Sequence, residues 1–262
     1  MSDFDRNATA RWGQPGVARA GRAAIDQGLR SYMLGVYNNM VIGLALTGLV
    51  ALGTNMLAVT SDPSQAVVRM GSIYLTSFGQ TLYGTPLKWV VMLAPLAFVL
   101  FFSFRINQMA ASTARTLFYA FAAVMGLSLS TILLVYTGTS VARAFFITAA
   151  SFGALSLYGY TTRRDLSGMG SFLIMGVFGL IIASLVNLFL QSSVFQLALS
   201  AITVLIFAGL TAYDTQTIKE MYYEADDYEV ATKKSVNGAL MLYLDFINIF
   251  QALVTLTGTR NE

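Results

Sequence analysis

The chain has 262 residues, of which 56% are hydrophobic and only 11% are charged, whereas a soluble domain carries about 25% charged residues. A soluble core of this size could not bury so much apolar surface, so the composition favours an all-α integral membrane protein. The absence of cysteine and histidine excludes disulfides, thiol nucleophiles and imidazole metal sites, and the net charge of +3 requires no nucleic-acid partner.

The uncharged runs predict seven membrane-spanning helices, because one span needs about 20 mostly apolar residues. The expected spans, in chain order, cover residues 31–60, 88–105, 116–137, 143–162, 168–190, 195–218 and 235–258. The apolar run from Leu166 to Tyr213 is too long for one helix, and Gln191-Ser192-Ser193 is the expected break. Residues 1–30 are polar and contain arginine, which predicts a flexible cytoplasmic tail and no cleavable signal peptide.

The lysine and arginine residues predict a cytoplasmic N-terminus, because cytoplasmic loops are enriched in these residues. In that orientation the opposite side keeps only a few of the 16 basic residues, namely Arg69, Lys88, Arg143 and Arg260. The bias supports an odd number of spans. Six spans and one re-entrant segment are the alternative.

Two of the loops are long. Residues 62–88 begin with Asp62-Pro63, a typical helix start, and predict an interfacial helix, a lid on the external face, or a lipid-contacting loop. Residues 219–234 are rich in acids and predict a solvated charged turn or a mouth that weakly attracts cations.

Asp214 and Asp245 are ionisable residues inside predicted spans, where charge is costly and therefore marks functional candidates. If the sixth helix continues to about Tyr223 and the seventh begins near Ser235, antiparallel packing brings both carboxylates to about the same height. Two carboxylates in a low-dielectric site cannot both ionise comfortably, so they would titrate as a unit. The pair is the expected sensor of pH near neutrality.

Other polar residues near the pair are candidates for the same site. Arg105 ends the second span on the side of Asp214 and could be the counter-charge or gate, or it could mark the membrane boundary and meet lipid phosphate. Carboxylate oxygens suit calcium, so Asp214 and Asp245 are also candidate calcium contacts. Asn248 and Thr255 could line a cation path, or they could form hydrogen bonds between helices.

No enzyme signature is present. Residues 235–258 contain no lysine for a retinal Schiff base, Gly168-Met169-Gly170-Ser171 does not match an intramembrane protease motif, and no glycine loop precedes a phosphate-binding lysine. We therefore expect no enzymatic activity and no cofactor, with calcium as a transported or bound ion.

Two stretches resemble the Bax inhibitor-1 family. Ala212-Tyr213-Asp214-Thr215-Gln216 resembles the signature of its penultimate helix, and the run ALMLYLDFINIF from Ala239 to Phe250 resembles that of its last helix. Asp165-Leu166-Ser167 is similar to the start of another family span, and the likeness covers roughly residues 30–258.

The resemblance implies a seven-helix bundle with a central last helix, and a calcium leak controlled by an aspartate dyad. The dyad maps onto Asp214 and Asp245, and Tyr213 and Tyr243 in the same motifs are candidates for lining the ion path. The family's arginine partner maps onto Arg105 by its place at the end of the second span. Some bacterial leak members carry a glutamate in the second span, near the place of Ala94 here, so a path that uses that acid is not expected.

The leading hypothesis is a passive, pH-regulated calcium leak in a bacterial inner membrane, with the lipid bilayer and the calcium ion as partners. The main alternative is a non-transporting protein that modulates a membrane protease or a stress response through partner contacts involving residues 1–28. A third possibility is a proton-coupled transporter, which would move its substrate uphill.

Overall fold

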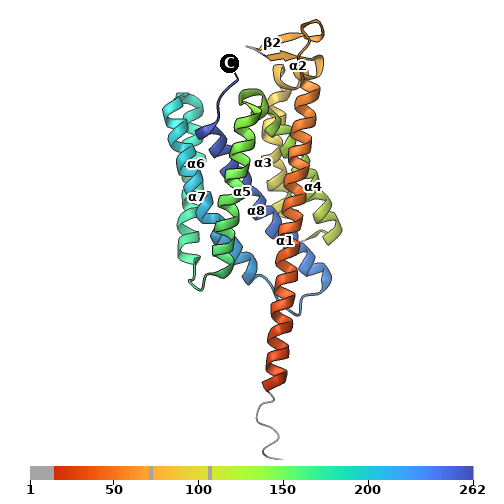
Figure 1. The fold of residues 1–262 in the computed structure, drawn as a ribbon, viewed down its shortest axis with the longest axis vertical. Helices are drawn as coiled ribbons and strands as arrows, with labels where there is room; N and C mark the ends of the chain where they lie inside the picture. Colours follow the sequence, from red (N-terminus) through yellow and green to blue (C-terminus); the bar gives the residue numbers. More distant parts are fainter. Residues whose placement is uncertain (1–14, 71–72, 106–107, 262) are drawn as a thin grey trace, which may run out of the picture.

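The protein is a bundle of long helices with a small sheet at one end (Figure 1). The computed structural model describes residues 15–70, 73–105 and 108–261. The elements, in chain order, are α1 Pro15–Ala58, β1 Val59–Thr60, η2 Pro63–Gln65, β2 Val68–Met70, β3 Ile73–Leu75, α2 Ser77–Gly84, α3 Leu87–Arg105, α4 Ala111–Val135, α5 Gly138–Thr161, α6 Ser167–Leu190, α7 Ser193–Glu220 and α8 Tyr228–Thr257.

Six of the described helices are long and apolar enough to cross a membrane, namely α1, α4, α5, α6, α7 and α8. A seventh span exists if α2 and α3 cross together, although they meet at a bend of 64°. The prediction of an all-α membrane protein is confirmed. The expected second span corresponds to α3, which contains Pro95 and exposes apolar side chains such as Trp89 and Leu93.

The last helix, α8, runs through the middle of the bundle (Figure 1). It packs against α1, α4, α5 and α7, and 61% of its most apolar window is buried, against 11–39% for the other spans. Tyr243 lies at the centre of the core, with its ring edge-on to Phe118 and Phe121 at centroid distances of 5.7 and 5.6 Å. Its hydroxyl shares a hydrogen bond of 2.7 Å with Thr47 of α1, so the polar atom of this buried ring is satisfied.

The long loop after α1 contains a sheet that the sequence analysis did not predict. Strands β1, β3 and β2 pair antiparallel in that order, and α2 follows them. Asp62 caps the short helix η2 as expected for Asp62-Pro63, since its carboxylate accepts a hydrogen bond from the Ser64 N–H. The hydroxyl groups of Tyr83 and Ser130 lie 2.7 Å apart and join α2 to α4. The loop is thus a folded cap on this end of the bundle.

Several helix ends differ from the expected spans. Helix α1 begins at Pro15, so part of the tail that was expected to be flexible is helical, while residues 1–14 lie outside the described residues. Helix α8 begins at Tyr228 and not near Ser235, because the Asp227 carboxylate accepts the Val230 N–H and caps the helix earlier. The break between α6 and α7, by contrast, lies where it was expected, since α6 ends at Leu190, α7 begins at Ser193 and Gln191 adopts a left-handed conformation with φ of 50°.

Candidate functional site

The two aspartates inside the bundle lie on helices that pack against each other. Asp214 is in α7 and Asp245 is in α8, and the short turn between these helices makes them antiparallel. The two carboxyl groups lie close enough to interact directly with each other. A hydrogen bond between carboxyl groups requires a proton on one of them, since an ionised carboxylate only accepts. The arrangement can therefore hold one shared proton between α7 and α8.

Asp245 of α8 is more shielded from solvent than Asp214 of α7. Asp245 is 3% exposed and Asp214 is half-buried. No donor among the described residues reaches Oδ2 of Asp245, and neither aspartate forms an ion pair with a described residue. Ionising both carboxyl groups here would place two uncompensated charges in a low-dielectric environment, which is strongly unfavourable.

Arg105, the expected counter-charge, does not lie at the pair. It is the exposed last residue of α3, and α3 packs on α4. Its place at the end of an apolar helix fits the alternative stated for it, an arginine at the membrane boundary. The sequence could not place Arg105 in space, because the order of residues along the chain does not show which helices α3 packs against.

The four candidate pore-lining residues, Asn248, Thr255, Tyr213 and Tyr243, make separate contacts and do not bond to one another. The Asn248 amide donates to the Leu244 carbonyl at 2.8 Å, and the Thr255 hydroxyl donates to the Gln251 carbonyl at 2.9 Å, both within α8. Tyr243 is bonded to Thr47, and the ring of Tyr213 lies directly over Gly170 of α6. The donors of Asn248 and Thr255 are therefore occupied inside their own helix, and Tyr213 packs on α6.

A chain of hydroxyl groups beside Asp214 was missed by the sequence analysis. The Tyr37 and Ser156 hydroxyls lie 2.6 Å apart, and the Ser156 and Thr215 hydroxyls lie 2.9 Å apart. Thr215 donates in turn to the Thr211 carbonyl at 2.7 Å. These bonds connect α1, α5 and α7 at the residue that follows Asp214. Residues with a hydroxyl group are common in membrane spans, so no sequence signal distinguishes Tyr37, Ser156 and Thr215. Only their contacts in the folded structure show that they form one chain.

Asp165, in the turn before α6, is the acid of the Asp165-Leu166-Ser167 motif. Its carboxylate accepts hydrogen bonds from the hydroxyl and the backbone N–H of Ser167, at 2.6 and 2.8 Å. Both bonds lower the pKa of Asp165 from its usual value, and the bond from the Ser167 hydroxyl has the larger effect. The ionised carboxylate of Asp165 stabilises the folded protein at pH values above the usual pKa of an aspartate. This contribution is lost as the pH falls through the lowered pKa of Asp165. Asp165 therefore does not titrate near neutral pH.

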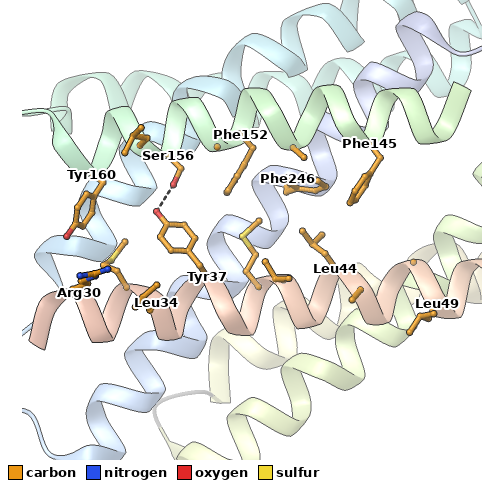
Figure 2. A pocket seen from close by; sticks show the side chains of 18 of the residues that line it. Arg30, Leu34, Tyr37, Leu44, Leu49, Phe145, Phe152, Ser156, Tyr160 and Phe246 are labelled. Atoms are coloured by element: carbon orange, nitrogen blue, oxygen red, sulfur yellow. Dashed lines mark hydrogen bonds between the residues drawn. The ribbon is translucent and has the colours of Figure 1, made fainter. Parts of the chain in front are cut away.

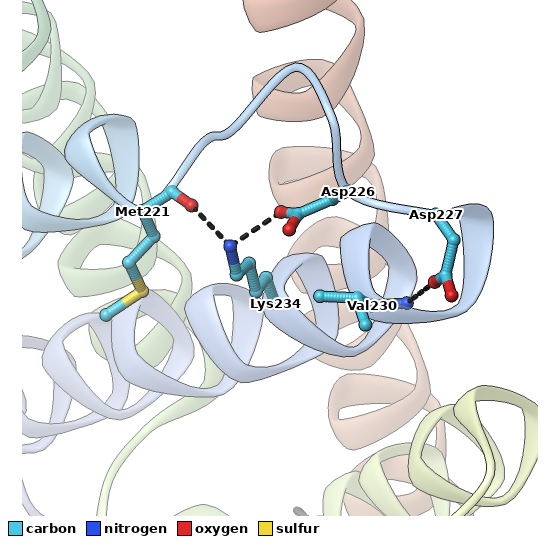
Figure 3. Close-up of polar contacts among 5 residues, drawn as sticks. All are labelled: Met221, Asp226, Asp227, Val230 and Lys234. Atoms are coloured by element: carbon cyan, nitrogen blue, oxygen red, sulfur yellow. Dashed lines mark hydrogen bonds and ion pairs between the residues drawn. The ribbon is translucent and has the colours of Figure 1, made fainter.

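The turn between α7 and α8 is held by Lys234, which the sequence analysis treated only as a cytoplasmic charge. Figure 3 shows its amine between the Met221 carbonyl, at 3.0 Å, and the carboxylate of Asp226. The side chains are 32% and 14% exposed for Lys234 and Asp226. The acidic loop is therefore not simply a solvated turn, because Asp226 is partly buried and paired.

The Lys234 contact predicts a measurable loss of stability. We expect Lys234→Met to lower the free energy of unfolding by about 2 kcal/mol, between the values for exposed and fully buried pairs. Lys233→Met is the matched control, because Lys233 pairs at 3.3 Å with Glu229, which is 56% exposed. That change should cost about 0.5 kcal/mol or less. Unfolding in detergent measures both, and equal losses would contradict the prediction.

Residues 29–262 match the profile of the family described as inhibitor of apoptosis-promoting Bax1. The chain belongs to the Bax inhibitor-1 family. An uncharacterized protein of Rickettsia prowazekii is 49% identical, with 90% of this chain and 93% of that protein covered. An uncharacterized protein of Caulobacter vibrioides is 42% identical over the full length of both chains.

A third relative is named as an inner membrane protein. The inner membrane protein YbhL of Escherichia coli is 41% identical, with 89% of this chain and 93% of that protein covered. The resemblance to the Bax inhibitor-1 family stated from two motifs is thus confirmed over most of the chain. Those two motifs lie in α7 and α8, where they contribute Asp214 and Asp245.

Proposed function

We propose that this Bax inhibitor-1 family protein is a pH-sensitive leak for cations, with calcium as the transported ion. The observation that carries the proposal is the pair of neighbouring carboxyl groups, Asp214 and the buried Asp245, between the central helix α8 and its neighbour α7. The protein would lie in the inner membrane with a cytoplasmic N-terminus. It would act without enzymatic chemistry and without a resident cofactor.

The shared proton gives the direction of the pH response. With one proton on Asp214 and Asp245, their hydrogen bond ties α8 to α7 and favours a closed bundle. Loss of the proton leaves two like charges side by side, and their repulsion is strong because little water screens it. Rising pH would therefore loosen α8 and raise the flux, and falling pH would close the path.

Calcium is proposed as cargo and not as a bound component. Calcium prefers carboxylate and amide oxygens, which Asp214, Asp245 and Asn248 supply on two adjacent helices. Among residues 15–70, 73–105 and 108–261, no group of three or more acidic residues could hold a metal ion. Two carboxylates alone bind weakly, and weak binding suits an ion that must leave again.

The test is calcium entry into proteoliposomes that contain a calcium dye. We expect the wild-type protein to pass calcium faster at about pH 8 than at about pH 6, with both rates above those of empty liposomes. No flux at either pH, from protein shown to be folded, would contradict the leak and favour the alternative of a non-transporting modulator of membrane partners. Uphill movement driven by a proton gradient would instead indicate a proton-coupled transporter.

A further inference from the structure

A large apolar groove runs between α1 and α5, with Phe246 of α8 at its floor (Figure 2). Its volume of about 1110 Å³ exceeds the roughly 300–1,000 Å³ of ordinary small-molecule pockets. The walls expose side chains such as Leu34 and Leu157, 58% and 62% accessible. Because α1 and α5 are both long and apolar enough to cross a membrane, these exposed walls suit contact with the hydrocarbon of a bilayer.

Two glycines widen the groove, although helix packing does not require them. A Cβ atom added at Gly48 of α1 or Gly153 of α5 would meet no atom within 4 Å. By contrast, a Cβ atom at Gly159 would collide with the backbone of Ala212, and one at Gly126 with the backbone of Thr47. A glycine inside a helix costs about 1 kcal/mol relative to alanine. Gly48 and Gly153 therefore keep space open on the two facing walls.

The groove is basic at one end and apolar at the other. Arg30 and Tyr160 lie together at the first end, and Leu49 and Phe145 lie at the second (Figure 2). Lys219 adds a second cation at the first end, since its amine donates to the Tyr160 carbonyl at 2.9 Å and lies 5.4 Å from the Tyr160 ring centre. Cationic pockets between membrane helices are suited to the phosphates of anionic lipids.

We propose that the α1–α5 groove binds one anionic phospholipid, with an acyl chain along the groove and the phosphate at Arg30. The exposed guanidinium can bind a phosphate through two parallel hydrogen bonds. The acyl chain lies beside Gly48 and Gly153 and reaches the apolar end near Phe145. The bound lipid would cover the apolar walls and the Tyr37–Ser156 hydrogen bond that lies within the groove.

Native mass spectrometry of the purified, delipidated chain titrated with phosphatidylglycerol tests the proposal. We expect one tightly bound lipid per wild-type protein, and a loss of affinity of about tenfold or more in Gly48→Leu and Gly153→Leu, whose side chains fill the groove. Gly179→Leu is the matched control and should bind as wild type, because a Cβ atom at Gly179 of α6 also meets no atom but lies outside the groove. Arg30→Gln should remove the preference for phosphatidylglycerol over phosphatidylcholine.

The position of the lipid is tested in the unaltered protein. Phosphatidylglycerol with a photoreactive group on its acyl chain should label residues of α1 and α5 that line the groove. Labelling elsewhere, or unchanged lipid affinity in both groove-filling variants, would overturn the proposal. A dimer that dissociates in Gly153→Leu would also overturn it, since a second copy of the chain would then occupy the groove. Melting curves of all variants verify that they are folded.

Discussion

The double substitution Asp214→Asn with Asp245→Asn is expected to abolish the pH dependence of calcium flux. Amide side chains neither bind nor release a proton, yet they can still form a hydrogen bond between α7 and α8. The variant should therefore behave as the protonated pair does, with low flux at both pH values. A one-proton switch changes its open-to-closed ratio by at most about tenfold per pH unit, so the wild-type contrast between pH 6 and pH 8 can reach about 100-fold.

The control for this experiment is another acid of the same chain. Asp165→Asn should leave the pH dependence intact, because the Ser167 bonds hold the pKa of Asp165 below its usual value and keep the carboxyl ionised throughout. The measurement is dye-reported calcium entry at about pH 6 and about pH 8 for all three proteins, scaled to the amount incorporated. A pH ratio in the double variant equal to that of wild type would show that another group senses the proton.

Much of the architecture could be predicted because lipid imposes simple rules on sequence. Apolar runs long enough to span hydrocarbon must be helices, so the expected spans correspond to α1 and α3 to α8. The closeness of Asp214 and Asp245 could be anticipated for a related reason. In two antiparallel helices joined by a short turn, the height of each residue follows from the number of residues between it and the turn. Asp214 and Asp245 therefore stay at a similar height even if the expected helix ends are wrong by a few residues.

Other features depended on contacts between distant segments, which no local pattern encodes. Strands β1, β2 and β3 are each two or three residues long, too short to show the alternation by which strands are recognised. The surroundings of Arg105 depend on how α3 packs. The hydroxyl chain from Tyr37 to Thr215 joins three helices, and the groove arises from the spacing of α1 and α5.

The second large effect is expected at Gly159, where α5 approaches α7 next to the dyad motif. A Cβ atom at this position would collide with the carbonyl of Ala212, which belongs to the backbone of α7 and cannot rotate away. Gly159→Leu should therefore force the two helices apart and lower the free energy of unfolding by about 3 kcal/mol or more, the upper range for overpacked cores. The separation would also weaken the Ser156–Thr215 hydrogen bond between α5 and α7.

Gly153→Leu is the matched control on the same helix, since it adds the same side chain where a Cβ atom meets nothing. In lipid-free detergent, this variant should unfold at the wild-type temperature or slightly above it, because leucine has a higher helix propensity than glycine. Thermal unfolding followed by circular dichroism compares the two variants directly. Equal melting temperatures would mean that α5 and α7 can separate at little cost, and that their close approach does not position the helix that carries Asp214.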